Sequence, residues 1–585
     1  LAYPSGTTLA STWNNDIVQD ITAFMGEDCR NFGVEMLLAP GMNIQKNILN
    51  GRNFEYFSED PYLTGLMAAN YTLGLQSTGV SVALKHYAAN NQETNRMNVS
   101  VEVTERALRE IYLRAFEYAV DIADPHSVMT SYNKIQGIYS GVNKNLVDVL
   151  REEFGFSGFV MTDWGTQINR VDMLKSGNDL YCGGNVIEEK IVEEILNGLN
   201  KGSLKMEQLN ACCENILNYI VISNAMKDID VTNTITNKAA KLKAIRQAGA
   251  EGTVLLKNDD NTLPLPITTV SLFGNASYRT EHCGYGSGYV NTSGVVSIKQ
   301  GLENAGIVLN SSVTALYKNC GQNAFGDADR NPSNDPYEIT VTSTIARDAA
   351  KISECAIYTI SRITSETMDH ENRAGDFLLN AKEKQAIQNL AAAFHAQGKK
   401  LIVIINTGNP IEVASWEHLA DAIIYAGLSG EQIGNSIGDI IRGKVNPSGK
   451  LTSTWPKKFS DTPYAAYFPG DYNSVVYNDD IYVGYRYYTT FGVDVMYEFG
   501  YGLSYTNFEY SNYKVKQDGK NYVLSVDVKN VGKVVFICIQ RAFNYQLRPL
   551  CQIMTSHRLA PFRFVLVNRQ ANYLQVITTQ IMESA

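Results

Sequence analysis

Residues 152–165 read EEFGFSGFVMTDWG, and this stretch joins the end of a helix to a short buried strand. The apolar residues of Val142–Phe154 recur at helical spacing, and Gly155 is a typical C-terminal stop. The apolar run Phe159–Thr162 then reads as a strand, and the polar residue Asp163 follows it directly. A helix followed at once by a short apolar strand predicts an α/β fold.

The same alternation of apolar runs and amphipathic helices extends over residues 1–222. A helix is expected over Glu105–Val120, where apolar residues again recur at helical spacing. The other expected strands are Val34–Ala39, Val80–Leu84, Ser127–Met129 and Asp179–Cys182. This rhythm is typical of parallel strands with helices outside them. A closed (β/α)₈ barrel usually needs about 250 residues, so we expect a TIM-type barrel that is incomplete at its N-terminus.

The chain after residue 222 predicts a linker, a second α/β unit and the start of a β-sandwich. Residues 223–242 are polar and irregular, which is typical of a linker, and residues 243–456 predict an open sheet between helices in an α/β sandwich. The expected strands are Gly252–Leu256, Val270–Gly274, Ala356–Ser361, Leu401–Asn406 and Ala422–Tyr425, and the clearest expected helix is Ala381–His395. Residues 457–505 form a Tyr-rich crossing segment. Plain alternation in residues 506–532 predicts the start of a β-sandwich.

The composition changes at residue 533. Residues 533–585 contain no Gly, no Asp and one acidic residue, Glu583, together with six Lys or Arg. A β-sandwich without glycine lacks its usual turn residue. We therefore expect this segment to be an aberrant tail, translated out of frame or otherwise foreign to the protein.

Composition excludes several classes of function. The net charge of −10 argues against binding to nucleic acid, because phosphates attract Lys and Arg. The sequence contains no run of about 18 apolar residues, so we expect no segment that spans a membrane. The nine cysteines include no CxxC pair and no Cys/His cluster, so we expect neither a metal site nor a disulfide scaffold. Reduced thiols favour a cytoplasmic over a periplasmic compartment, but the sequence leaves the compartment and the oligomeric state open.

Polar residues gather at the ends of the expected strands of the first unit. In a barrel, these C-terminal ends face one mouth, where active sites lie. That mouth would collect Arg52, Lys85, His86, Arg96, Tyr132 and Asp163. Cations around Asp163 would lower its pKa and keep it ionised, and Trp164 offers a flat apolar face for a sugar ring. A single Asp-Trp pair is more often structural, but three such motifs on consecutive strand ends favour a functional site.

Several longer motifs resemble glycoside hydrolase family 3, and most closely its bacterial β-glucosidase branch. They are GRNFEYFSEDP at 51–61, KHYAANNQETNR at 85–96, TERALREIYL at 104–113, SYNKIQG at 131–137, EEFGFSGFVMTDWG at 152–165 and FGYGLSYT at 499–506. The resemblance extends from residue 1 to about 532. It implies a (β/α)₈ barrel, an α/β sandwich and a fibronectin type III domain, and hydrolysis of β-glycosides with retention at the anomeric carbon.

The resemblance also implies roles for individual residues. Asp163 matches the family's nucleophile, and Glu366 falls on the position of the acid/base, with a pKa that we expect to be raised. Arg52, Lys85, His86, Arg96, Tyr132 and Ser287 match residues that hold the sugar hydroxyls. The acid/base segment departs from the family pattern, since Ser365 and Thr367 replace two glycines. Glu371 and Glu354 are the nearby alternatives to Glu366.

Other readings stay open at this point. The family's β-xylosidases and arabinosidases differ from its β-glucosidases in a pocket that the sequence does not reveal. The Asp-Gly-Pro motif of the first barrel strand, whose Asp binds glucose, has no match, so we expect a truncated product that is weakly active or inactive. A non-catalytic carbohydrate-binding remnant is the competing class. The glycine-rich stretch 284–288 is a weak signal for a nucleotide, and no cofactor is implied. The expected partner is a small β-linked gluco-oligosaccharide.

Overall fold

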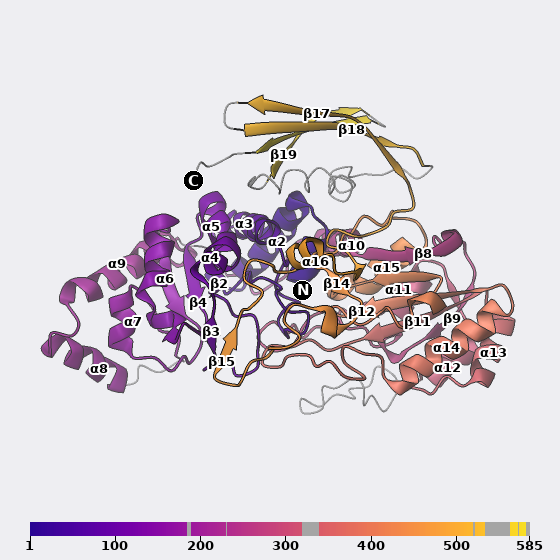
Figure 1. Cartoon of the computed structure of the whole chain (residues 1–585), viewed down its shortest axis with the longest axis horizontal. Helices are drawn as coiled ribbons and strands as arrows, with labels where there is room; N and C mark the ends of the chain where they lie inside the picture. The colour runs from indigo at the N-terminus through magenta and orange to yellow at the C-terminus, as the bar shows by residue number, and fades with distance from the viewer. Residues whose placement is uncertain are drawn as a thin grey trace.

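The computed structural model describes residues 1–183, 189–227, 229, 231–318, 338–518, 521–532, 562–570 and 573–580. Two α/β units lie side by side, and a separate β-sheet lies above them (Figure 1). No helix in the described ranges has the length and apolar content needed to cross a bilayer.

The first unit is built on a parallel sheet in the order β1-β2-β4-β7. Its strands are β1 (Met36–Leu37), β2 (Ser81–Tyr87), β4 (Ser127–Thr130) and β7 (Phe159–Thr162). The run expected as a strand at 179–182 makes a single parallel bridge, from Leu180 to Met161. A second isolated parallel bridge joins Gly41 to Lys85 of β2, so the described residues form an open four-stranded parallel sheet with two further bridges.

Helices cover both faces of this sheet, because its side chains alternate. On one face, Val82, Val128 and Val160 belong to a hydrophobic cluster that also contains residues of α2, α3 and α5. On the other face, Ala83 and Met129 belong to a second cluster, against which residues of α9 pack. The helices of the unit are α1 (Gly6–Ser11), α2 (Asn15–Asn31), α3 (Pro61–Gln76), α4 (Glu105–Ala107), α5 (Arg114–Ala123), α6 (Lys144–Asp148), α7 (Arg170–Ser176), α8 (Glu189–Asn200) and α9 (Met206–Ile222). The expected helices at 105–120 and 142–154 are present, each with a π-helical part, at Leu108–Leu113 and Val149–Glu153.

The second unit contains a six-stranded sheet in the order β10-β9-β11-β12-β13-β8. Its strands are β8 (Val254–Asn258), β9 (Thr269–Phe273), β10 (Val308–Leu309), β11 (Cys355–Ser361), β12 (Lys400–Asn406) and β13 (Ala422–Tyr425). All neighbours pair in parallel except β13 and β8, which pair antiparallel. The central strands are apolar on both faces, as expected for a sheet covered on both sides.

Two groups of helices cover the second sheet. One face packs against α10 (Lys238–Gly252), α11 (Ile298–Asn304) and α15 (Ile433–Ile441). The other packs against α12 (Ser311–Leu316), α13 (Ser343–Ile352) and α14 (Ala381–His395). The expected linker at 223–242 is helical from Lys238 onward, because Ile245 and Ala248 of α10 bury themselves in the core. Residues 238–242 of the expected linker therefore belong to α10.

The Tyr-rich segment 457–505 returns to the first unit. It contains β15 (Ser474–Val476), α16 (Tyr485–Phe491) and β16 (Val495–Tyr497), and β16 pairs with β14 (Trp455–Pro456). β15 pairs in parallel with β3 (Ser100–Glu102), which extends to β5 (Lys134–Ile135) and β6 (Ile138–Tyr139). This segment therefore ties the two units together.

The last sheet is antiparallel in the order β17-β18-β20-β19. Its strands are β17 (Phe508–Asp518), β18 (Asn521–Asn530), β19 (Phe562–Gln570) and β20 (Tyr573–Gln580). Two of the strands thus come from the segment 533–585 that was expected to be an aberrant tail. The rest of that segment lies outside the described residues.

A buried ion pair fixes the crossing segment to the first unit. The ammonium of Lys46 lies 2.5 Å from the carboxylate of Asp479 and 2.9 Å from the hydroxyl of Tyr467. The ring centroids of Tyr464, Tyr467 and Tyr477 lie 4.6–5.4 Å from the same nitrogen. Burial lowers the pKa of Lys46, and Asp479 opposes that shift.

Replacing Asp479 with Ala would leave Lys46 buried without its counter-charge. We expect Asp479→Ala to lower the free energy of unfolding by about 3–5 kcal/mol. Asp494→Ala is the matched control, because its pair with Lys457 is solvent-exposed, and it should cost less than about 1 kcal/mol. Urea denaturation followed by circular dichroism measures both, and equal losses in the two variants would contradict this reading.

Candidate active site

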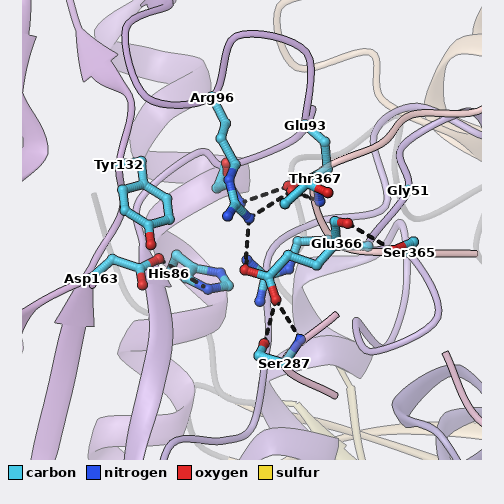
Figure 2. Close-up of polar contacts among 12 residues, drawn as sticks. Gly51, His86, Glu93, Arg96, Tyr132, Asp163, Ser287, Ser365, Glu366 and Thr367 are labelled. Atoms are coloured by element: carbon cyan, nitrogen blue, oxygen red, sulfur yellow. Dashed lines mark hydrogen bonds and ion pairs between the residues drawn. The ribbon is translucent and has the colours of Figure 1, made fainter. Parts of the chain in front are cut away.

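The residues expected at the site converge from both α/β units (Figure 2). His86 lies on β2, Tyr132 and Asp163 follow the ends of β4 and β7, and all three belong to the first unit. Glu366 lies on the loop after β11, and Ser287 lies on the loop between β9 and α11, in the second unit. The C-terminal ends of parallel strands thus bring the first group together, and two loops of the neighbouring unit supply the rest.

Asp163 is a buried carboxylate with one free oxygen. Its Oδ1 accepts a hydrogen bond of 2.7 Å from the backbone N–H of Trp164. Its Oδ2 is buried and has no hydrogen bond within the described part of the chain, although His86 Nε2 lies 3.6 Å away. Burial raises the pKa of Asp163, and the charges of Arg52 and Lys85 only partly oppose this. The expectation of a lowered pKa was therefore wrong.

His86 is held so that its ring faces Asp163. Asn43 Oδ1 accepts from the backbone N–H of His86 at 2.9 Å and lies 3.3 Å from Nδ1, and the hydroxyl of Tyr56 lies 3.4 Å from the same nitrogen. Burial lowers the pKa of His86, and the charges of Arg52 and Lys85 lower it further. A neutral imidazole therefore presents Nε2 to the carboxylate.

The cations of the site pair mainly with carboxylates other than Asp163. Arg52 pairs with Glu55, whose other oxygen lies 3.8 Å from Lys85 Nζ. Arg96 Nη1 lies 2.7 Å from Glu93 and 2.8 Å from Glu366. Glu55 and Glu93 were not singled out from the sequence, although both lie inside the quoted motifs. The expected ring of cations around Asp163 is therefore not present, because these cations lie against Glu55, Glu93 and Glu366.

Glu366 is the carboxylate that the donors actually surround. Its Oε1 lies 2.8 Å from Arg96 and 3.5 Å from Arg52 Nη1, and its Oε2 accepts from the backbone N–H of Ser287 at 2.8 Å and from the Ser287 hydroxyl. Burial alone would raise the pKa of Glu366, but Arg52, Ser287 and Arg96 outweigh it and lower the pKa to about 2. The expected raised pKa was thus wrong for this structure, in which Glu366 is ionised.

Backbone contacts hold the Glu366 loop against the glycine-rich loop. Tyr285 donates its N–H to Thr364 O at 2.9 Å and accepts from the N–H of Glu366 at 3.1 Å. Gly286 has a φ of 91°, and a Cβ there would lie 2.4 Å from the Cβ of Glu366. The glycine-rich stretch therefore serves the acid side chain, because only a residue without a side chain lets the loop approach so closely.

Trp164 and Tyr132 lie at the site, whereas the alternative acids Glu371 and Glu354 do not. The Trp164 side chain is 53% exposed, and Tyr132 lies under the guanidinium of Arg96, 4.8 Å from it, with its hydroxyl donating to Trp164 O at 2.9 Å. Glu371 pairs with Arg373 at the surface, and Glu354 lies near Lys399, so neither alternative acid reaches the site. Among the described residues, no group of three or more His, Cys, Asp or Glu could hold a metal ion.

Comparison with known proteins agrees with this arrangement. Residues 2–219 match the glycosyl hydrolase family 3 N-terminal domain, and residues 253–505 match the corresponding C-terminal domain. The chain belongs to glycoside hydrolase family 3. Its sequence is 37% identical to the thermostable beta-glucosidase B of Acetivibrio thermocellus over 91% of this chain and 68% of that protein.

Two further relatives bear on specificity within family 3. The exo-alpha-(1->6)-L-arabinopyranosidase of Bifidobacterium longum is 34% identical over 89% of this chain and 66% of its own length. The structure of beta-glucosidase 3B from Thermotoga neapolitana in complex with alpha-D-glucose is 38% identical, with a TM-score of 0.87 over 99% of this chain and 80% of that one. The chain spans about two thirds of the length of these curated relatives.

The approach of the two units at Gly51 can be tested by adding one methyl group. A Cβ at Gly51 would lie 1.8 Å from Met368 O and 2.5 Å from Ser365 O, both in the Glu366 loop. We expect Gly51→Ala to lower the free energy of unfolding by about 1–3 kcal/mol through overpacking. Gly288→Ala is the control, since its Cβ would lie 3.4 Å from Phe54, and it should be nearly neutral. Urea denaturation compares the two, and a neutral Gly51→Ala would show that this contact is loose.

Proposed function

We propose that this family 3 chain is a retaining β-glucosidase that releases terminal β-D-glucosyl residues from small oligosaccharides or aryl glucosides. The observation that carries the proposal is the convergence of Asp163 and Glu366, two carboxyl groups from separate units, on one site with Arg52 and Arg96. Retaining glycosidases need two such carboxyl groups about 5–5.5 Å apart. The relatives named beta-glucosidase and the neighbour with bound glucose support the choice of sugar.

In this mechanism, Asp163 is the nucleophile. Its Oδ2 has no hydrogen-bond partner within the described residues, so its lone pairs are available for attack on the anomeric carbon. The bond that forms joins Oδ2 to that carbon, and the bond to the leaving oxygen breaks. The positive charges of Arg52 and Lys85 favour its ionised form and partly oppose the rise in pKa that burial causes.

Glu366 is the acid/base in the same proposal. It must first donate a proton to the leaving oxygen and then accept one from water. Since its pKa is about 2 with Arg96 and Ser287 in place, the substrate must weaken those contacts or exclude water for Glu366 to be protonated. The same contacts favour the ionised base in the second step, after Asp163 has become a neutral ester.

We propose that the other polar groups hold the sugar. Hydrogen-bond donors and acceptors that suit the hydroxyls of a pyranose lie around the two carboxylates. They belong to Arg52, Lys85, His86, Arg96, Tyr132 and Ser287. The exposed face of Trp164 would stack on the sugar or on the group that leaves. A second candidate activity is cleavage of arabinopyranosides, which the Bifidobacterium longum relative favours.

We also propose a finer division of the chain into domains. Residues 1–222 would be the larger part of a (β/α)₈ barrel, residues 243–456 an α/β sandwich, and residues 506–532 the start of a fibronectin type III-like domain. The parallel order of β1, β2, β4 and β7 supports the barrel, and the antiparallel pairing of β17 with β18 supports the third domain.

The test of the activity is hydrolysis of p-nitrophenyl β-D-glucopyranoside, with the α-L-arabinopyranoside as the competing substrate. We expect the glucoside to be preferred and Asp163→Ala to lower kcat/KM by about 10⁴-fold or more, because the nucleophile is gone. A preference for the arabinoside would favour the second activity. Hydrolysis that survives Asp163→Ala would contradict the assignment of the nucleophile.

The contact of Ser287 with Glu366 predicts a pH effect. The Ser287 hydroxyl lowers the pKa of Glu366, so Ser287→Ala should raise that pKa and keep the acid protonated to higher pH. The basic limb of the kcat/KM profile should therefore move to higher pH. Ser365→Ala is the control, since its hydroxyl donates to the main-chain oxygen of Glu366 rather than to the carboxylate. A limb that stays in place or moves down in Ser287→Ala would refute the assignment of Glu366 as acid.

A further inference from the structure

Asp369 ties the Glu366 loop to the first unit. It lies three residues after Glu366, and its carboxylate accepts backbone N–H groups of Gly51 at 3.1 Å, Glu93 at 3.0 Å and Thr94 at 2.8 Å. The Thr94 hydroxyl also donates to it at 2.7 Å. A carboxylate of the second unit thus satisfies donors on two loops of the first.

Glu93 makes the reciprocal contact. Its side chain is fully covered, and its Oε2 accepts the backbone N–H of Thr367 at 2.7 Å. The same oxygen lies 2.7 Å from Arg96 Nη1, and this nitrogen also donates to Glu366 Oε1 at 2.8 Å. Glu93 therefore holds both the peptide that follows Glu366 and the cation that faces it (Figure 2).

The backbone at Thr367 explains why such a hold is needed. Thr367 has a φ of 76°, in the left-handed region that β-branched residues rarely occupy. Residues in this region are strained, and they persist only when their surroundings hold them in place. The group that Glu93 binds is the N–H of this same residue, so its hydrogen bond stabilises the strained conformation next to Glu366.

We propose that Glu93 and Asp369 form a reciprocal clasp that positions Glu366 for proton transfer. Each carboxylate sits on one unit and accepts hydrogen bonds from the loop of the other. Both are positioning residues, since they act through Thr367, Arg96 and the loop backbone. The inference rests on the proposed function only in the role given to Glu366.

The test compares two leaving groups. Glu93→Ala removes the acceptor for Thr367, so Glu366 should be misplaced and kcat/KM for phenyl β-D-glucopyranoside should fall about 100-fold. For 2,4-dinitrophenyl β-D-glucopyranoside, whose leaving group needs no proton, kcat/KM should change less than about 10-fold. Its kcat and KM should fall together, because the base that hydrolyses the intermediate is misplaced as well. Glu371→Ala is the matched control, since this carboxylate is exposed in the same loop. It should leave kcat/KM unchanged for both glucosides.

Two further variants separate positioning from folding. Glu93→Gln keeps an oxygen for the N–H of Thr367 and should recover much of the loss. Thr367→Gly removes the strained side chain, so Glu93→Ala should cost less in that background than alone. Equal losses on both glucosides, or no selective loss on the phenyl glucoside, would overturn the proposal.

A second readout does not depend on the activity. Hydrogen–deuterium exchange of peptides covering 362–370 should be faster in Glu93→Ala than in the unmodified chain and unchanged in Glu371→Ala. Unchanged exchange in Glu93→Ala would overturn the clasp. If the unmodified chain hydrolyses neither glucoside, the proposed β-glucosidase function fails, and the exchange result alone decides whether the clasp exists.

Discussion

The site depends on one contact, the docking of the loop after β11 onto the loops around Gly51 and Glu93. Asp163 follows a strand of the first unit and Glu366 belongs to the second, so neither unit contains the two carboxyl groups by itself. Asp369 supplies buried acceptors across that contact, and Gly51 leaves room for the backbone of the Glu366 loop. The buried pair of Lys46 and Asp479 binds the crossing segment to the first unit nearby. The placement of Asp163 relative to Glu366 therefore depends on the contact between the two units.

The distribution of charge follows from the same contact. Arg96 pairs with Glu366 across the contact, and Glu55 pairs with Arg52 and Lys85. The negative charge of the buried Asp163 is therefore less well balanced by these cations than the charges of Glu55 and Glu366 are. The pKa of Glu366 is about 2, whereas burial raises that of Asp163. The carboxylate that must donate a proton is thus the better stabilised anion in this structure. Substrate contacts with Arg96 and Ser287 are the means by which the mechanism can reverse that order.

Much of the fold could be predicted from the sequence, because buried strands and long amphipathic helices have strong local patterns. The strands Phe159–Thr162 and Ala422–Tyr425 and the helix Ala381–His395 have the expected bounds. The start of α10 was missed because the stretch that contains it, residues 223–242, is mostly polar. Glu93 and Asp369 were missed as partners because their contacts join residues about 275 positions apart. Local sequence patterns carry no information on contacts between such distant residues. The lowered pKa of Glu366 depends on contacts of this kind, for example with Arg96.

The central claim is that Asp163 forms a covalent intermediate with a β-glucosyl residue while Glu366 acts from the other unit. The most direct measurement is incubation with 2,4-dinitrophenyl 2-deoxy-2-fluoro-β-D-glucopyranoside, followed by mass spectrometry of the intact chain and of its peptides. The electronegative fluorine slows hydrolysis of the intermediate, so the label should accumulate. The account predicts one 2-deoxy-2-fluoroglucosyl group per chain, attached to Asp163. A chain that turns over the parent glucoside yet carries no label, or carries it on another carboxylate, would contradict the account.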